Sequence, residues 1–476
     1  MKIKNMLSLA LKALSQEPEV YIAYLFGNKT HELSFLNKKK KMYTGKLQRI
    51  IIFFWIALRR FSLLQKKVKR VDVVYYAETS NQFNSLIPSY NEISKIEKCS
   101  FILDKEAAGK KSKVCNSYKL GFDMKHLIGS LYLMLARHSK LDKELNEKNL
   151  SKEIKYNLDK FYVPYPYLLF FLSFLKNAQP RVVVVSNDHN PTNRSLKLAA
   201  EVLKIKTAYM QHASVSNLFP PLEFDYAFLD GVISLNEYVE CQNKAKRIRK
   251  SKSRVYLCGQ QKKVLKNNSS IKKRGVGIGV NKLDDVKKVI SLIERLNRLD
   301  CKVYVRVHPY QGKEFLNSIS NRFRNNESVE IINPRDISLS DFFGFCSVLI
   351  AADTSLHLEA ALAGIETYYY NMGGEKTDYY GFVRNGVSNY LPKDLKTIEI
   401  SKNDEKGKRE TAIRKYSESY KTSWQDKEGC LVASILKDIV NETDCSDRFF
   451  YRLEPSFCFD KVFLLNHKGS NDVDLQ

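Results

Sequence analysis

The sequence predicts an α/β protein that contains two doubly wound parallel sheets, with a basic helical region before them. From residue 71 onward, short runs of β-branched and aromatic residues alternate with stretches of helical periodicity. Most of these runs end in polar residues, as buried parallel strands do where the chain leaves the sheet. A polar segment rich in Lys and Asn, residues 260–273, separates two such series and is the best candidate for a linker.

The first series contains the clearest central strand, Arg181-Val182-Val183-Val184-Val185, which ends in Ser186-Asn187-Asp188-His189-Asn190. Further strands are expected at residues 71–77, 207–210, 226–229, 232–234 and 254–257, and helices at residues 127–136, 167–176 and 194–203. The rest of residues 100–160 is polar, rich in Lys and without a clear pattern.

The second series begins at Gly275-Val276-Gly277-Ile278-Gly279, whose glycine spacing does not fit the dinucleotide-binding fingerprint. Strands are expected at 275–280, 302–308, 329–332, 348–351 and 366–370, and helices at 284–299, 312–323, 339–344 and 356–363. Residues 401–441 have a helical pattern and a polar tail follows. We therefore expect four parts: a helical extension (1–70), two α/β domains (71–262 and 271–400) and C-terminal helices with a tail (401–476).

The composition indicates a folded basic protein that works on anionic partners. The chain has 476 residues, 44% of them hydrophobic, and a formal net charge of +26 at pH 7. Nucleic acid, acidic lipid and phosphorylated substrates all fit such a charge. The nine cysteines include no CxxC pair, which argues against a zinc site or a disulfide framework and favours a reducing cytoplasm.

The N-terminal region is expected to lie on a membrane surface rather than to cross the membrane. The first residues read as a short amphipathic helix, because Lys12 interrupts the apolar run and no cleavage site follows. Residues 50–58 form a dense apolar block, too short for the roughly 20 residues that span a bilayer. Basic clusters flank this block, so residues 38–70 predict contact with an anionic leaflet. A core helix with solvated basic ends is the alternative.

Candidate phosphate-binding residues follow two strands of the second series. His308 ends one strand, with Arg306 two residues earlier on the same face and Pro309 restricting the backbone after it. Thr354 and Ser355 follow another strand, where hydroxyls and the N–H groups of a helix start can hold an anion. Glu359, one turn later, is placed to accept hydrogen bonds from ribose hydroxyls. Purely structural roles, as a strand-end histidine and an ordinary helix cap, are the alternative.

These segments resemble a known group of enzymes. Val305-Arg306-Val307-His308-Pro309 and Ser355-(x)3-Glu359-Ala360-Ala361-(x)2-Gly364 look like the donor-domain signatures of glycosyltransferases with two Rossmann-like domains, the GT-B fold. The His-Pro form is similar to bacterial sialyl-, polysialyl- and Kdo-transferases and to CDP-glycerol glycerophosphotransferases. The resemblance implies a first domain for the acceptor and a second for the nucleotide donor, with His308 and Ser355 at the donor phosphate and Glu359 near the ribose.

The acceptor half should supply a base that deprotonates the attacking hydroxyl. Gln211-His212-Ala213 looks like the Gln-His-Gly segment of those enzymes, although Ala213 replaces the glycine, and only Asp230 represents their acidic pair. Asp188, His189 and His212 all fall at expected strand ends, with Asp188 and His212 as the leading candidates and Glu78 as a weaker carboxylate. No DxD pair lies in a convincing metal-binding loop, so we expect no metal and no cofactor beyond the nucleotide-sugar co-substrate.

The function expected from the sequence is transfer of a sugar from a nucleotide sugar to a glycan or lipid-linked acceptor in bacterial capsule, O-antigen or other surface polysaccharide synthesis, at the inner face of the plasma membrane. A glycerol- or ribitol-phosphate transferase that uses a CDP-linked donor is the nearest enzymatic alternative. A nucleotide-sugar epimerase fits less well, because it leaves the basic aromatic N-terminal region without a purpose. A nucleic-acid-binding protein is the non-enzymatic alternative, but no nucleic-acid-binding motif is present, so nucleic acid is not expected as a partner.

Overall fold

The computed structural model describes most of the chain, and all structural statements below concern this part. It covers residues 1–24, 45–62, 66–150, 158–245, 251–260, 275–299, 301–309, 311–373, 378–399, 404–443, 448–455 and 458–466. The lysine cluster at residues 38–41, nearly all of the expected linker and the polar tail lie outside the described residues.

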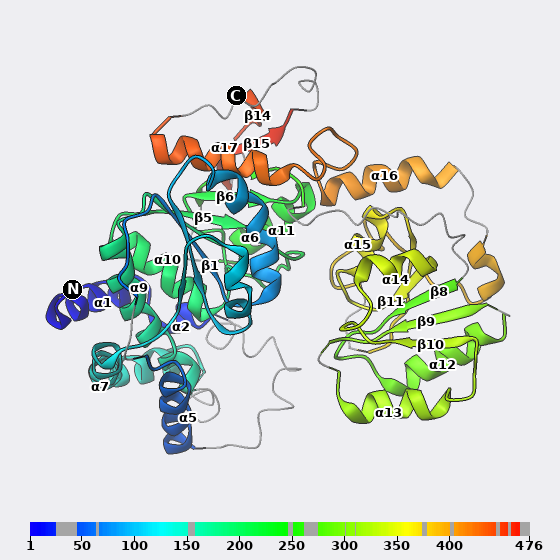
Figure 1. Cartoon of the computed structure of the whole chain (residues 1–476), viewed down its shortest axis with the longest axis horizontal. Coiled ribbons are helices and arrows are strands. Elements are labelled where there is room, and N and C mark those ends of the chain that lie inside the picture. Colours follow the sequence, from blue (N-terminus) through cyan, green and yellow to red (C-terminus); the bar gives the residue numbers. More distant parts are fainter. Residues whose placement is uncertain are drawn as a thin grey trace.

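The described strands form two separate sheets, which lie in two lobes (Figure 1). The first is nine-stranded, and in spatial order its strands are β14 (Phe450–Arg452), β15 (Phe459–Leu465), β7 (Ser251–Leu257), β6 (Tyr226–Leu229), β5 (Lys206–Met210), β4 (Val182–Val185), β1 (Val73–Ala77), β2 (Cys99–Leu103) and β3 (Ser117–Lys119). Every neighbouring pair is parallel except β14 with β15.

Helices cover both faces of this sheet, because successive side chains on a strand point to opposite faces. Val74 and Tyr76 of β1 pack into one core, and Val73 and Tyr75 pack into another on the opposite face. The helices of this lobe are α1 (Ile3–Gln16), α2 (Glu19–Ile22), α5 (Lys46–Leu58), α6 (Ser80–Ile93), α7 (Met124–Glu147), α9 (Pro164–Ala178), α10 (Pro191–Val202), α11 (Val232–Lys244) and α17 (Glu428–Asn441), with a 3-10 segment at Lys105–Lys113.

Residues 1–24 and the described strands β14 and β15 belong to this first domain, which differs from the expected division. Met6, Ala10 and Leu14 of α1 are completely or almost completely buried in its core, so residues 1–24 are an integral layer rather than an extension. At the other end, β15 pairs with β7 and the ring of Phe463 stacks on Tyr256, with centroids 4.7 Å apart. The sequence expectation of a separate C-terminal part is therefore corrected, because the open edge of β7 takes up these strands.

The second sheet is six-stranded and entirely parallel. Its order is β10 (Val329–Ile332), β9 (Lys302–Arg306), β8 (Gly275–Gly279), β11 (Cys346–Ala351), β12 (Glu366–Tyr369) and β13 (Asn389–Tyr390). The helices of this lobe are α12 (Val286–Asn297), α13 (Lys313–Arg322), α14 (Leu339–Phe345) and α15 (Leu356–Leu362), with a 3-10 segment at Leu395–Glu399.

The alternating glycines of β8 allow close packing on one face of this sheet. A Cβ on Gly277 would lie 3.0 Å from the ring of Phe342 on α14, and one on Gly279 would lie 2.7 Å from a methyl group of Leu356 on α15. Any larger residue would therefore push α14 and α15 away from the sheet. The Gly-x-Gly-x-Gly pattern is explained by this contact rather than by a dinucleotide fingerprint.

Helix α16 (Asp404–Tyr416) carries the chain back from the second lobe to the first (Figure 1). Tyr416 and Ile413 pack in a small core with Leu358 of α15, against which Ile233 of α11 also packs. A Cβ on Gly231 would lie 2.5 Å from the carbonyl oxygen of Lys415, so the two chain segments touch here. The short strand expected at residues 232–234 is wrong, because these residues form the first turn of α11.

The fold predicted from the sequence, an α/β protein with two Rossmann-like doubly wound domains, is confirmed. Strand β10 agrees with its expected range, and β4, β6, β8, β11 and β12 agree to within a few residues. Among the described residues, none of the helices combines the length and the apolar character that crossing a bilayer requires.

One buried carboxyl group makes the stability of this fold depend on pH. Burial raises the pKa of Glu428 to about 7, even though the Ser419 hydroxyl donates a hydrogen bond to it. The folded state therefore prefers the protonated acid, and the chain loses stability as pH rises from about 4.5 through 7. We expect Glu428→Gln to raise the free energy of unfolding at pH 8 by up to about 3 kcal/mol and to change it little at pH 4.

Urea unfolding at the two pH values measures this difference. Glu147→Gln is the control, because the Glu147 side chain is 62% exposed and its replacement should matter at neither pH. An equal effect of Glu428→Gln at both pH values would contradict the assignment.

Candidate active site

The loop after β4 holds an aspartate and a histidine in direct contact. The Asn187 side-chain oxygen accepts hydrogen bonds from the backbone N–H groups of His189 and Asn190, which fixes the turn. Asn190 then caps α10 by accepting from the N–H of Asn193. Within this turn, Nδ1 of His189 lies 2.8 Å from Oδ1 of Asp188.

The two side chains differ in access. Asp188 is 1% exposed, and its second oxygen accepts a hydrogen bond of 2.7 Å from the hydroxyl of Tyr238 on α11. The His189 ring packs on Phe219, with centroids 4.3 Å apart, and keeps 17% of its surface exposed. An ionised carboxylate only accepts hydrogen bonds, so Asp188 places the proton of His189 on Nδ1. Nε2 then accepts a longer bond of 3.3 Å from the Asn187 amide.

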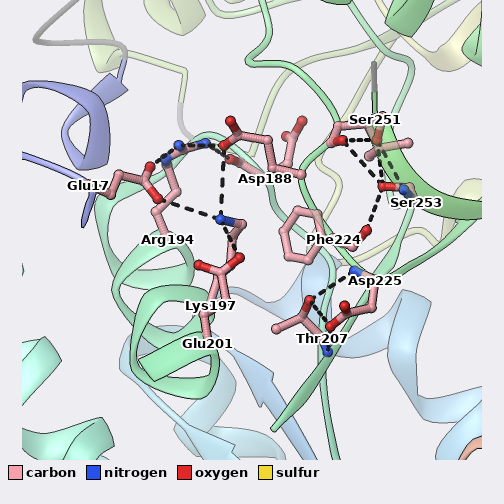
Figure 2. A network of polar contacts seen from close by, with 12 residues as sticks. Glu17, Asp188, Arg194, Lys197, Glu201, Thr207, Phe224, Asp225, Ser251 and Ser253 are labelled. Carbon is pink, nitrogen blue, oxygen red and sulfur yellow. Dashed lines mark hydrogen bonds and ion pairs between the residues drawn. The ribbon is translucent and has the colours of Figure 1, made fainter. Parts of the chain in front are cut away.

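A buried network of charged side chains contacts the backbone of this loop (Figure 2). Arg194 of α10 donates to the backbone oxygen of Asp188, at 3.2 Å, and to the carboxylates of Glu17 and Glu223. Lys197, one turn later, lies 2.9 Å from Glu201 and 3.5 Å from Glu17. Burial alone would lower the pKa of Arg194, but the neighbouring carboxylates outweigh it and the net shift is upward. Both cations therefore stay charged, and α1 is tied to α10.

The neighbouring strand ends contribute further polar groups. Glu78, at the end of β1, accepts hydrogen bonds from Asn190 and Thr192, at 2.8 and 2.7 Å. This joins the ends of β1 and β4. Gln211, after β5, accepts from the N–H of Asp230 and donates to the carbonyl of Ala213, so the half-buried His212 sits on a fixed segment. Glu78 is thus engaged within the fold, whereas His189 and His212 remain partly exposed.

In the second domain, the expected phosphate-binding residues emerge at one edge of the sheet. Arg306 of β9, Gly279 of β8 and Ala351 of β11 are in register, so the residues that follow each strand leave the sheet together. His308 is half-buried, and burial together with the charge of Lys282 lowers its pKa. A neutral imidazole at physiological pH can donate or accept one hydrogen bond at each nitrogen. Lys282, which the sequence analysis missed, follows β8 at the same edge.

Arg306 and Glu359 also approach each other across this edge. Burial lowers the pKa of Arg306, and the nearby Glu359 carboxylate partly opposes this shift. The guanidinium donates to the carbonyl of Ile337 before α14, at 2.8 Å. Ser355 donates to the Glu359 carboxylate at 3.1 Å, and the Thr354 hydroxyl lies 3.4 Å from the N–H of Leu356. These hydroxyls thus meet polar groups of their own helix.

A loop of the second domain closes onto the first. The Asp353 carboxylate accepts hydrogen bonds from the Tyr369 hydroxyl and from the backbone N–H of Tyr379. The second bond positions the ring of Tyr379. The hydroxyls of Tyr379 and Ser216 form a hydrogen bond between the two domains, and Arg384 lies 3.7 Å from Glu237. Sequence reasoning missed these residues, because only the folded arrangement of both domains brings them together.

Two cavities in the described parts of the chain differ greatly in size. The one at the domain boundary has a volume of about 10 Å³ and is lined by residues of both domains, including Gln211, Asp230, Leu358 and Tyr380. It holds no more than about one water molecule. The larger one, of about 930 Å³, lies within the first domain and reaches Glu78, Asn190 and Thr192. The eight site residues predicted from the sequence line neither of them.

No protein-family model matches the chain, and no curated protein is detectably similar in sequence. Solved structures are similar in fold. The structure of Staphylococcus aureus MnaA with UDP superposes with a TM-score of 0.51 at 10% identity, covering 78% of this chain and 97% of that one.

Weaker similarities exist to Methanocaldococcus jannaschii UDP-GlcNAc 2-epimerase (TM-score 0.44, 13% identity, 77% and 99% covered) and to Acinetobacter baumannii MurG (0.46, 11%, 78% and 99%). The two sheets, together with the similarity in fold to the MnaA structure, give the chain the GT-B-like architecture of two Rossmann-like domains.

Proposed function

We propose that the protein is a glycosyltransferase that binds a nucleotide sugar on its second domain and transfers the sugar to an acceptor held by its first domain. The observation that carries this proposal is the common sheet edge of the second domain, where Lys282, Arg306, His308 and the Thr354–Ser355 hydroxyls emerge together. Cations and hydroxyls on rigid strand ends are the groups that stabilise a departing phosphate. The similarity in fold to a structure that contains UDP makes UDP the first nucleotide to test.

In this proposal, His189 is the base and Asp188 is a positioning residue. The Nε2 atom of His189 accepts the acceptor's proton while Asp188 holds Nδ1–H, and the hydroxyl replaces the 3.3 Å bond from Asn187. This choice differs from the preference for Asp188 or His212 that the sequence alone suggests, because the Asp188 carboxylate is buried and accepts two hydrogen bonds. Lys282 and His308 stabilise the leaving phosphate.

Nucleotide binding tests the donor half directly. A ligand that binds only the folded state raises the melting temperature, and saturation at 100 times Kd corresponds to about 2.7 kcal/mol. We expect one of UDP, CDP, CMP and GDP to stabilise the full chain. His308→Ala should weaken that binding by about ten- to a hundredfold, because a hydrogen bond to a charged group contributes about 1.5–3 kcal/mol.

The matched control is His138→Ala, a histidine of α7 in the first domain that pairs with the hydroxyl of Tyr162. This variant should keep the full nucleotide response. Stabilisation by none of the four nucleotides, or an unchanged response of His308→Ala, would refute the proposed donor site. Formation of product only when an acceptor is present would separate a transferase from an epimerase.

A further inference from the structure

Helices α5 and α7 lie side by side and antiparallel at one end of the first domain. Two backbone hydrogen bonds connect the end of α5 to the start of α7. The N–H of Phe122 donates to the carbonyl of Arg60, and the N–H of Ser62 donates to the carbonyl of Phe122. At the opposite end, Lys46 of α5 lies 3.9 Å from Asp142 of α7. The two helices are thus connected near both ends, and Figure 1 shows them together below the first sheet.

Both helices bury one face and expose apolar side chains on the other. Phe53 and Ala57 of α5 and Leu133 and Leu141 of α7 are buried in the core. Two exposed stripes remain, Leu47, Ile51, Trp55 and Leu58 on α5 and Met124, Ile128, Leu131, Tyr132 and Leu135 on α7. Trp55 is 53% exposed and Leu135 is 70% exposed. These two stripes, together called here the α5–α7 face, hold nine of the thirteen large apolar side chains that the described residues expose.

The face is basic at the end where α5 finishes and α7 begins. Arg59 stacks on the ring of Trp55, with its guanidinium carbon 3.4 Å from the ring centroid. Lys66, Lys67, Lys69 and Arg70 follow α5 and are exposed, and Lys125 is exposed at the start of α7. An apolar surface that contains Trp and has Lys and Arg at one end matches the interface of an anionic bilayer, where the apolar side chains enter the headgroup layer and the cations pair with lipid phosphates.

The 930 Å³ cavity opens beside this face. Trp55 and Arg59 of α5 form part of its wall, and Glu78, Asn190 and Thr192 form another part, next to the loop of His189. The described lining includes the cations Arg59, Arg60, Lys66, Lys111, Lys119 and Lys160 but only two carboxylates.

Those two carboxylates are already bonded within the protein. Asp104 pairs with Arg60 at 3.1 Å and accepts from the hydroxyl of Tyr167, while Glu78 accepts from Asn190 and Thr192. Of the six cations, Arg60 pairs with Asp104, and Lys160 lies 3.2 Å from Asp159. The other four, Arg59, Lys66, Lys111 and Lys119, make the cavity favour an anionic guest. Its apolar wall, which includes Phe61, Phe170 and Phe174, suits the part of the guest nearest the acyl chains.

We propose that the α5–α7 face docks on an anionic bilayer and that the cavity behind α5 binds the phosphate-bearing head of a lipid drawn from that bilayer. The route from the bilayer then runs past Trp55 and Arg59 to Thr192 and the loop of His189. The role of this lipid as the sugar acceptor rests on the proposed glycosyltransferase function, whereas docking and headgroup binding do not.

Co-sedimentation of the full chain with vesicles tests the docking. The chain should bind phosphatidylcholine vesicles that contain phosphatidylglycerol, bind pure phosphatidylcholine weakly, and lose binding as salt rises. The double variant Trp55→Ser/Leu135→Ser should bind the anionic vesicles about tenfold more weakly or worse, because both removed side chains are exposed and lie on the face. The matched control is Leu283→Ser/Tyr390→Ser, which changes two similarly exposed apolar residues of the second domain and should bind normally.

Unchanged binding by the α5–α7 variant would overturn the docking. So would a stable dimer in solution that this variant converts to monomer, because a second copy would then be the partner of the face. The nucleotide response of the variant should stay intact, which separates a failure of docking from a failure of the proposed donor site.

Soluble short-chain lipids test the cavity. Dihexanoyl phosphatidic acid should raise the melting temperature, and dihexanoyl phosphatidylcholine and inorganic phosphate should do so much less. Lys119→Gln, in the cavity wall, should reduce the response severalfold, while Lys98→Gln, an exposed lysine before β2, should keep it. An equal response to inorganic phosphate would mean a simple anion site, and no response to phosphatidic acid would refute the headgroup site.

Discussion

Replacing Arg194 by methionine should lower the free energy of unfolding by about 3–5 kcal/mol, the largest effect on stability that we expect from a single substitution. Arg194 is 4% exposed and lies between Glu17 and Glu223. Methionine has a similar length but no charge, so the variant leaves the carboxylates of Glu17 and Glu223 beside Lys197 without the positive charge of Arg194. Removing one member of such a network costs more than the network contributes as a whole, because the remaining charges stay desolvated.

The substitution should also loosen the start of the chain. Glu17 connects the end of α1 to α10, and α1 buries its apolar face against the same core. Proteolysis near residue 17 should therefore become faster in the variant, in addition to the lower urea midpoint.

The matched control is Arg181→Met. Arg181 also pairs with a glutamate, Glu442, at 3.1 Å, but the two side chains are 53% and 82% exposed. Solvent screens such a pair, so its removal should change the free energy of unfolding by less than about 1 kcal/mol. Similar losses in the two variants would show that burial does not decide the strength of the Arg194 network.

Replacing His189 by alanine should reduce kcat for sugar transfer by about 10²–10⁴-fold, the range expected for the loss of a general base. Nucleotide binding should not change, because the expected donor residues lie on the second domain and His189 is on the first. The measurement is acceptor-dependent release of the nucleotide whose binding the thermal-shift screen identifies, with kcat and KM determined separately.

Asp188→Asn tests the positioning role. The asparagine keeps the size of the side chain but has one acceptor oxygen instead of two, so it cannot accept from both Tyr238 and Nδ1–H of His189. We expect a smaller loss of kcat than in His189→Ala, and little further loss when the two substitutions are combined. His138→Ala should keep normal turnover. Full activity of His189→Ala would exclude it as the base and return the choice to His212.

The sequence was sufficient to predict the strands and helices whose pattern of apolar residues lies within the element itself. The run Val182–Val185 predicted a central strand, because a strand covered on both faces needs apolar residues throughout. The alternation of Val303 and Val305 predicted a strand with one fully buried face. The strand ends at Asp188 and His308 followed from the same patterns. Strands β3 and β15 were not predicted. Strand β3 has only three residues and therefore shows no periodicity, and β15 forms by pairing with the edge of β7, about 200 residues earlier.

Only the tertiary structure determines which side chains are buried and which remain exposed to solvent. Asp188 and His189 both follow the same strand, so the sequence does not show which of them is accessible. Tyr238 of α11 and Arg194 of α10 contact and bury Asp188, whereas the His189 ring keeps an exposed edge. In α5 the apolar residues nearly encircle the helix, and only packing shows that Phe53 faces the core and Trp55 faces out. Local sequence determines the backbone period, whereas burial depends on contacts between distant segments, and burial determines which polar group can react.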